Sequence, residues 1–460
     1  MPCHLDATGP QMSTRVELTT EDRGEAPNVG RSAEVSSAMV AAERPGASSD
    51  VMALVVSRDN LFAAYHRVKK NKGAPGIDGM TVHELRGWLV TNWQEVREQL
   101  LAGTYEPAPV RRVLIPKPGG GERMLGIPTV VDRLIQQALL QVLQPAWDAS
   151  FSDHSYGFRP GRSAHDALRR AQKYIQGGRR WVVDIDLERF FDEVNHDILM
   201  ARIAARVSDW RVLRVIRAYL RAGIMSDGVA MERHKGTPQG GPLSPLLANL
   251  LLDEVDKTLE ASGHAFVRYA DDCNVYVRSK RAGERVYARL EGLYARLHLR
   301  VNRKKSAVSS VYRRQFLGYA FWASRGGRAK LRIAKKSLKR MKARVRQLTR
   351  RNCGLSIGYV VERLSHYLRG WKAYFKLAST PRVLADVDKW IRHRLRAIQL
   401  KQWKRPRTIY REILKRGGSK DLAARVAKNA RRWWRNSAMA LNRVLPNSWL
   451  DGLGLYRLAA

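Results

Sequence analysis

The chain has 460 residues, enough for two or three domains, and a formal net charge of +41 from 83 Lys and Arg against 42 Asp and Glu. Such an excess fits a polyanionic partner such as nucleic acid. No apolar run approaches the length of a membrane-spanning helix or a signal-peptide core, and three dispersed cysteines argue against disulfides and cysteine-based zinc sites. We therefore expect a reduced, cytoplasmic protein without a membrane or a disulfide-linked partner.

The first 50 residues differ in composition from the rest of the chain. They hold four Arg, eight acidic residues and few large apolar residues, without sustained periodicity. This composition predicts a disordered extension. A helical spacing of apolar residues begins near Asp59, and a turn-rich segment at 73–79 separates it from a further helix near Thr81.

Residues 111–128 predict a β-hairpin, because a glycine-rich turn separates two short strand-like runs. Lys117 and Arg123 flank this turn. Two cations on a flexible hairpin can close over a triphosphate, although solvent-facing charges on a surface hairpin would have the same sequence. The apolar spacing from Asp132 to Trp147 then predicts a helix.

A polar segment from Ser155 to Ser163 precedes another predicted helix, which runs to Tyr174 with Ser163 as its N-cap. The segment carries Arg159 and Arg162. These two arginines either bind phosphate or cover the protein surface.

Residues 181–192 begin as a strand, in which the alternation of side chains puts Asp184 and Asp186 on the same face. Residues 198–220 predict one helix. Residues 229–235 predict a short hairpin.

Residues 236–245 are rich in glycine, which permits close approach of the backbone. Gln239 in this segment can hydrogen-bond without a charge. Ser244 as N-cap and Pro245 at the first helical position predict the start of a helix whose apolar stripe belongs to the core.

The twelve residues from Phe266 to Val277 predict a second hairpin, in which two β-rich runs flank an acidic bend. The bend holds Asp271 beside Asp272, and two like charges held together are costly unless a metal offsets them. An Asp-Asp pair also occurs as a plain polar turn. If Asp186 meets this hairpin, the three carboxylates form an oxygen site that suits two divalent cations in phosphoryl transfer.

The last third of the chain carries most of the excess charge. Residues 328–460 hold 36 Lys and Arg against 6 Asp and Glu, a net charge of +30. Aromatic residues alternate with arginine in 365–375, which suits RNA, although helix core is the simpler interpretation. Residues 401–407 are the better candidate for RNA contact, through the cations Lys401, Lys404, Arg405 and Arg407.

Three motifs in this order resemble the palm of reverse transcriptases encoded by group II introns. They are the run from Asp186 to Asp192, Gly236 to Pro245, and Tyr269-Ala-Asp-Asp272. The segments 155–163, 365–375 and 390–396 also resemble this family, and the resemblance covers about residues 58–445.

The resemblance implies roles for the candidate residues. Asp186, Asp271 and Asp272 would be catalytic and would hold two Mg²⁺ ions, with Mn²⁺ as a substitute. Nucleotide binding would involve Lys117 and Arg123 at the fingertip, Phe191 as the bulky residue that excludes a 2′-OH, Gln239 beside the sugar and base, and Lys305 near the triphosphate. Arg159 and Arg162 would contact template phosphate. Phe191 is otherwise a core aromatic, and the sequence leaves open whether Phe190 or Phe191 faces the sugar.

The fold implied by the resemblance is an α/β right-hand polymerase fold, with fingers and palm, followed by an all-α basic thumb and maturase domain. We expect residues 1–50 to be the extension, 51–325 the fingers and palm, 326–400 the thumb and the start of the maturase domain, and 401–460 a basic maturase or DNA-binding region. Nothing near the end of the chain resembles the Cys-rich HNH endonuclease module of some members. The expected type is therefore bacterial, without second-strand nicking.

The implied function is RNA-directed DNA polymerisation on a primer-template duplex with dNTP. The basic region would bind the parent group II intron RNA, assist its splicing and help it enter target DNA by target-primed reverse transcription. Two alternatives remain open. The chain could be a retron or diversity-generating reverse transcriptase, or a splicing-only maturase with an inert polymerase site.

Overall fold

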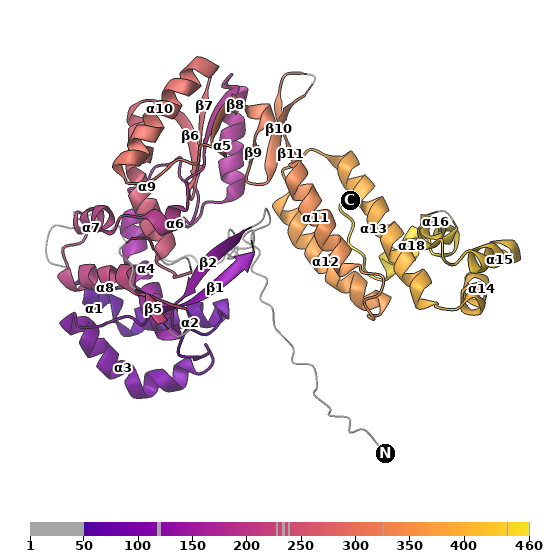
Figure 1. Cartoon of the computed structure of the whole chain (residues 1–460), viewed down its shortest axis with the longest axis horizontal. Coiled ribbons are helices and arrows are strands. Elements are labelled where there is room, and N and C mark those ends of the chain that lie inside the picture. Colours follow the sequence, from indigo (N-terminus) through magenta and orange to yellow (C-terminus); the bar gives the residue numbers. More distant parts are fainter. Residues whose placement is uncertain are drawn as a thin grey trace, which may run out of the picture. The chain divides into compact units, whose positions relative to one another are not determined.

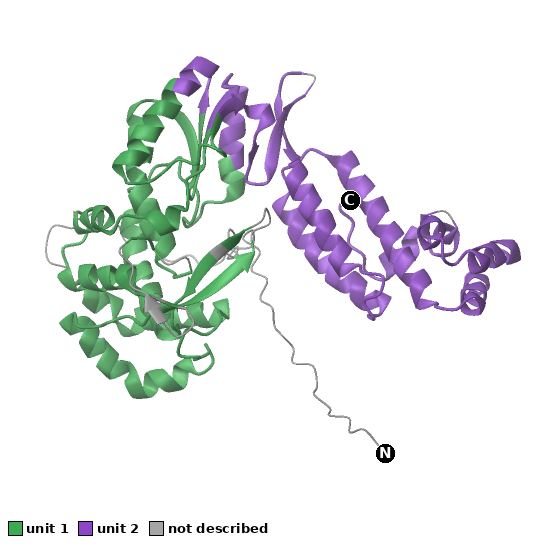
Figure 2. Cartoon of the chain, in the orientation of Figure 1, with its two compact units in different colours: residues 1–167, 184–275, 285–307 green, residues 168–183, 276–284, 308–460 purple. Residues whose placement is uncertain are grey.

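The structure is a computed structural model (Figure 1), and it describes residues 50–116, 121–226, 229–231, 235–237, 240–324, 326–438 and 440–459. The predicted extension lies outside these ranges except for Asp50, whose side chain caps helix α1 (Val51–Val55). The chain divides into two compact units (Figure 2). The first comprises residues 1–167, 184–275 and 285–307, and the second comprises residues 168–183, 276–284 and 308–460.

The first unit contains a small sheet of order β2-β1-β4-β5. The predicted hairpin of residues 111–128 is present in it, as the antiparallel strands β1 (Val110–Pro116) and β2 (Glu122–Ile127). Strand β4 (Ile224–Ser226) runs parallel to β1, and β5 (Val229–Met231) runs antiparallel to β4. The helices that lie wholly in this unit are α1, α2 (Arg58–Asn71), α3 (Leu85–Ala102), α4 (Val130–Asp148), α6 (Phe190–Glu193), α7 (His196–Ala204), α8 (Trp210–Arg221) and α9 (Ser244–Ala261).

The single helix predicted for residues 198–220 is wrong, because the structure has two helices there, α7 and α8. Asp209 ends the interruption: its carboxylate accepts a hydrogen bond from the backbone N–H of Arg211 and so caps α8. The N-cap of α9 is Leu243, so that Ser244 and Pro245 are its first two residues, one position later in the helix than predicted. The apolar stripe of α9 is buried as predicted.

The predicted strand that begins at residue 181 and the acidic hairpin belong to a four-stranded sheet of order β6-β7-β3-β8. Its strands are β3 (Trp181–Ile185), β6 (Ala265–Tyr269), β7 (Asp272–Val277) and β8 (Ala307–Ser310). The division into units crosses this sheet, as it crosses α5 (Ala164–Gln176) and α10 (Lys280–Arg296). The strand ends that carry the predicted catalytic aspartates all belong to the first unit.

The second unit begins its separate part with a three-stranded sheet of order β11-β10-β9. Its strands are β9 (Gln315–Phe316), β10 (Tyr319–Ala323) and β11 (Ala329–Ile333), preceded by the short 3₁₀ helix η1 (Val311–Arg313). After Ile333 the described residues form helices and loops without a strand. These helices are α11 (Lys335–Leu348), α12 (Ile357–Tyr374), α13 (Pro381–Gln402), α14 (Pro406–Lys415), α15 (Lys420–Lys428), α16 (Trp433–Ala438), α17 (Leu441–Val444) and α18 (Asn447–Gly452).

Candidate active site

The acidic hairpin is formed by β6 and β7, which are joined by a two-residue turn at Ala270 and Asp271. Ala270 has a φ of 57°, a positive value of the kind that the first residue of a tight hairpin turn adopts. The strands themselves are buried, because their apolar residues pack in the core. The turn therefore presents Asp271 and Asp272 at the partly exposed end of a rigid ribbon.

Asp186 follows the end of β3 and is held by its own backbone. Its N–H donates to the Ser306 hydroxyl at 2.9 Å, and its carbonyl accepts from the N–H of Asn302 at 2.8 Å. One residue further, Leu187 and Val301 form an isolated antiparallel bridge. The segment 301–306 therefore fixes the backbone position from which the Asp186 side chain extends.

The electrostatics show that the separated carboxylates lie near one another. The pKa of Asp272 is raised from 3.8 to about 8, first by burial and then by the negative charges of Asp271, Asp184 and Asp186. The Lys305 ammonium opposes this rise and lies 3.2 Å from the Asp186 carboxylate. Acidic groups from two distant segments thus share one negatively charged region, as the sequence predicted.

The donor set of this region fits a divalent cation, since it offers carboxylate oxygens whose mutual repulsion a cation would relieve. Within the described part of the chain, however, no three His, Cys, Asp or Glu side chains converge as a ready-made metal cage. A Lys305 cation occupies one side of Asp186 instead. Side-chain movement at Asp186 and Lys305 would therefore accompany metal binding.

The raised pKa of Asp272 predicts how stability depends on pH without metal. Because the folded protein holds the Asp272 proton up to about pH 8 and the unfolded chain releases it near pH 4, this group's stabilising contribution is present below pH 4 and is lost as pH rises to 8. Asp272→Asn cannot ionise. In chelator, we expect its melting temperature to match the unsubstituted protein at low pH and to exceed it at pH 9, as measured by thermal denaturation. A difference that does not grow with pH would contradict this prediction.

The structure distinguishes the two neighbouring phenylalanines after Asp186. Phe190 is buried, whereas Phe191 is only half-buried, and the two rings meet edge to face with centroids 5.1 Å apart. The Phe191 carbonyl accepts a hydrogen bond from the N–H of Thr237 at 2.7 Å, which joins this segment to the glycine-rich motif. Of the pair, Phe191 is thus the residue available to a ligand.

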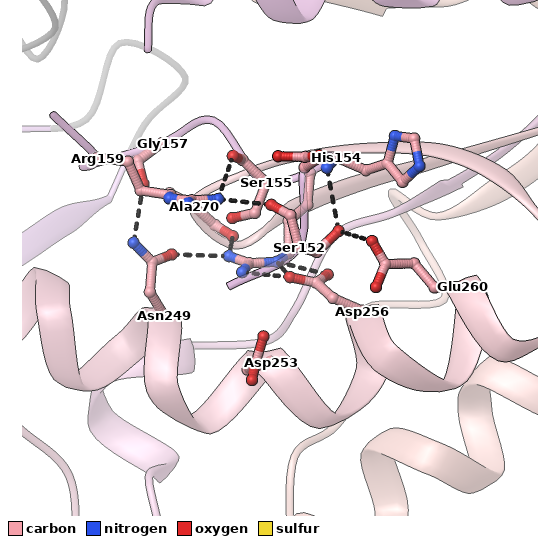
Figure 3. A network of polar contacts seen from close by, with 12 residues as sticks. Ser152, His154, Ser155, Gly157, Arg159, Asn249, Asp253, Asp256, Glu260 and Ala270 are labelled. Atoms are coloured by element: carbon pink, nitrogen blue, oxygen red, sulfur yellow. Dashed lines mark hydrogen bonds and ion pairs between the residues drawn. The ribbon is translucent and has the colours of Figure 1, made fainter. Parts of the chain in front are cut away.

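The predicted phosphate contact of Arg159 needs correction. Its side chain is 2% exposed, and its guanidinium donates to the Asp148 carboxylate and to backbone carbonyls that include those of Ser152 and Ser155 (Figure 3). All three guanidinium nitrogens are engaged within the protein, so none is directed to an outside phosphate. Arg162 is half-buried and pairs with the exposed carboxylate of Asp153 at 2.7 Å, so its predicted contact remains a prediction.

Three of the predicted nucleotide contacts are not placed by the structure. Lys117 and Gln239 lie outside the described residues. Arg123 lies on β2, where its backbone pairs with Ile115, and its side chain is not described. Their roles stay predictions.

In the second unit, the four cations predicted to contact RNA are exposed: Lys401, Lys404, Arg405 and Arg407. They lie where α13 ends and α14 begins. Trp403, between them, is buried in a core cluster with residues of α14 and α15. The cations therefore lie on the exposed side of a junction between α13 and α14 whose inner side is buried.

A second basic cluster was not singled out from the sequence. The cations of Lys342 and Arg346 on α11 and of Arg394 on α13 lie 5.4–5.8 Å from the centroid of the half-buried Trp390 ring. Burial, followed by the charge of Arg346, lowers the pKa of Arg394. The spacing of four residues within each helix was the available signal. Crowded positive charge beside an indole suits a nucleic-acid phosphate.

Comparisons with known proteins match two separate segments of the chain to family models. A family model described as "Reverse transcriptase (RNA-dependent DNA polymerase)" matches residues 115–321, and one described as "Group II intron, maturase-specific domain" matches residues 338–418. Protein YkfC of Escherichia coli (strain K12) is 34% identical over 302 residues, 57% of this chain and 79% of YkfC. The group II intron-encoded protein LtrA of Lactococcus lactis subsp. cremoris is 38% identical over 200 residues, 43% of this chain and 33% of LtrA.

Similarity to solved structures is weaker. A chain of the "Partial Cas6-RT-Cas1--Cas2 complex" is 25% identical with a TM-score of 0.36, and the match covers 56% of this chain and 45% of that chain. Although the match spans most of YkfC, it spans only a third of LtrA.

Proposed function

This chain belongs to the family of reverse transcriptases and maturases encoded by group II introns, and we propose that it copies RNA into DNA and assists the splicing and mobility of a parent intron. The reverse transcriptase match supports the predicted right-hand fold of fingers and palm, with a helical region after it. The proposed domain limits are those predicted: 1–50, 51–325, 326–400 and 401–460.

The observation that carries the polymerase proposal is the shared negative region of Asp186, Asp271 and Asp272. A reverse transcriptase requires a divalent metal, and we propose that these three residues hold two Mg²⁺ ions, with Mn²⁺ as a substitute. Bound there, the ions would offset the charge of the phosphates at which the primer 3′-OH attacks. We further propose that Lys305, whose ammonium lies 3.2 Å from the Asp186 carboxylate, pairs with a triphosphate oxygen once a metal ion replaces it there.

The test of this proposal is primer extension by the purified full chain. With an RNA template, an annealed DNA primer, dNTP and Mg²⁺, we expect processive cDNA synthesis that a chelator abolishes. No incorporation with either Mg²⁺ or Mn²⁺ would favour the alternative of a splicing-only maturase with an inert site.

The basic second unit supports binding of intron RNA. The maturase-specific match falls on α11 to α14, the helices that carry both the Trp390 cluster and the exposed cations of residues 401–407. The same match separates this chain from the alternative of a retron or diversity-generating reverse transcriptase. Contact with target DNA during target-primed reverse transcription is part of the proposal and follows from family membership.

Phe191 is the proposed filter against ribonucleotides, because its ring is partly exposed and it follows Asp186 by five residues in the sequence. Phe191→Ala should raise incorporation of rNTP relative to dNTP by about 100-fold, since a large ring that excludes one hydroxyl is worth about 1–3 kcal/mol. The measurement is the ratio of kcat/KM values in single-nucleotide extension. Phe190→Leu, at the buried neighbour, is the matched control and should leave the ratio unchanged. Equal ratios in both variants would remove Phe191 from this role.

Among the described residues, no helix combines the length and the apolar content needed to cross a membrane. Both described cysteines, Cys273 and Cys353, are free thiols. Free thiols fit a reducing compartment, and we propose a cytoplasmic, bacterial location where intron transcripts and dNTP are available.

A further inference from the structure

Arg268 is a fully buried arginine three residues ahead of Asp271. It lies on β6, and its ion pair with Asp256 of α9 has no exposed side-chain surface on either partner. Its Nε and Nη2 atoms donate to the Asp256 carboxylate at 2.6–2.9 Å, which leaves Nη1 for other acceptors. Because the guanidinium is planar, binding two of its nitrogens to one carboxylate fixes the direction in which the third nitrogen donates.

That remaining donor group reaches the turn of the acidic hairpin. Nη1 of Arg268 donates to the carbonyl oxygen of Ala270 at 2.9 Å, and also to Oδ1 of Asn249 at 2.9 Å. Ala270 has its φ at 57°, a conformation that a residue with a Cβ keeps only when its surroundings impose it. Arg268 is therefore one of the contacts that hold the turn in this conformation.

Asn249 joins the same turn to a second segment. Its side chain is buried, and its Nδ2 donates to the carbonyl oxygen of Gly157 at 2.9 Å. Gly157 presses directly against the turn, because a Cβ at this position would lie 2.3 Å from the backbone nitrogen of Ala270. Figure 3 shows Asn249 and Asp256 on one face of α9, turned toward Gly157 and Ala270.

The backbone completes this arrangement. The N–H of Arg268 donates to the His154 carbonyl, and the N–H of Tyr156 donates to the Arg268 carbonyl, each at 2.9 Å. The segment 154–157 is thus bonded along the edge of β6 up to the turn. The turn is held by the segment 154–157 through the backbone and by α9 through Asn249 and Arg268.

We propose that Asn249 and Arg268 are positioning residues of the polymerase site, which fix the Ala270 carbonyl and thereby the direction in which Asp271 and Asp272 present their carboxylates. The inference rests on the proposed polymerase function. Neither side chain touches substrate, and both act through the backbone of the turn. Positioning of this kind matters because reacting groups must be held to within about 0.5 Å of the productive geometry.

A purely stabilising network is the competing explanation, and substitution of Arg268 cannot distinguish the two. Removing one partner of a buried ion pair leaves an uncompensated charge, which destabilises the fold for any role. Asn249 is neutral, so that Asn249→Ala leaves the pair of Arg268 with Asp256 intact. It removes only the link between α9, the turn and Gly157.

The experiment compares full-length Asn249→Ala with Asn60→Ala as a matched control. The Asn60 side chain also donates to two backbone carbonyls, those of Val55 and Ala138, in a partly buried position on α2. Amide hydrogen exchange of residues 265–277 is measured without metal, and kcat and KM for dNTP are measured by primer extension. For Asn249→Ala we expect about 10-fold faster exchange at the turn and about 10-fold lower kcat at an unchanged KM. For Asn60→Ala we expect neither change.

If Asn249→Ala does not fold, Asn249→Leu carries the comparison, because leucine is neutral, has a similar branched shape, and lacks both the acceptor for Arg268 and the donor to Gly157. A folded variant with the exchange rates and kcat of the unsubstituted protein overturns the inference. If the unsubstituted protein extends no primer, the proposed function fails instead. The exchange comparison then still decides whether Asn249 orders the hairpin.

Discussion

Asp271→Ala and Asp272→Ala should each reduce primer extension on an RNA template by about 1,000-fold or more, because either change removes several kcal/mol of charge stabilisation from the transition state. The two carboxylates occupy the turn and the first residue of β7, and the charges of Asp184 and Asp186 reach Asp272. The measurement is single-turnover incorporation of one dNTP at saturating Mg²⁺.

Asp184→Ala is the matched control for these substitutions. Asp184 lies on β3, and its charge also raises the pKa of Asp272, yet the sequence favours Asp186 over it as a metal ligand. We expect the rate of Asp184→Ala to stay within about 10-fold of that of the unsubstituted protein, because Asp184 contributes negative charge to the site but is not a proposed metal ligand. Equal incorporation by the unsubstituted protein, Asp271→Ala and Asp272→Ala would defeat the polymerase assignment, provided that all three have similar thermal unfolding curves.

Replacing Lys401, Lys404, Arg405 and Arg407 together with glutamine should weaken binding of the parent intron RNA by about 100-fold at physiological salt. The physical reason is that each phosphate contact releases counterions on binding, and this gain is lost with the contact. Each lost contact should therefore also lower the slope of log affinity against log salt by about 0.7–0.9. All four side chains are exposed, and no ion pair within the described residues neutralises them. The measurement is filter binding across a salt series with the full-length chain.

A change of four charges also alters the overall field of the protein, so the control has the same charge change elsewhere. Exposed arginines at and before α10 provide it: Arg278, Arg281, Arg285 and Arg289. Their replacement with glutamine should change affinity by less than about 10-fold, because long-range charge is screened within about 10 Å. Equal losses in both variants would show that the effect comes from net charge and that residues 401–407 are not an RNA contact.

Most of the local structure near the site could be predicted from the sequence. The alternation in residues 181–186 put two aspartates on one face of a strand, and the charges of both reach Asp272 in the structure. The β-rich runs around Asp271 formed the expected hairpin. Where the prediction was wrong, as in the single helix of residues 198–220, a capping residue, Asp209, was present in the sequence and was overlooked.

The roles of individual side chains were less predictable. Nothing in the order of residues distinguishes Phe190 from Phe191, or indicates that Arg159 turns inward to Asp148 while Arg162 stays partly exposed. The contact of Lys305 with Asp186 joins residues that are 119 positions apart. The link from Asn249 to Gly157 spans 92 positions.

The sequence by itself determined the family, most of the strands and helices near the site, the acidic turn and the concentration of positive charge in the last third. Periodicity, turn chemistry and capping depend on neighbours within a few residues, so they can be read along the chain. Only the tertiary structure decided which aromatic ring is half-exposed, which arginine is buried and which side chains hold the acidic turn. Those outcomes depend on packing between distant segments, where burial penalises every unpaired polar group and selects the partners that satisfy it.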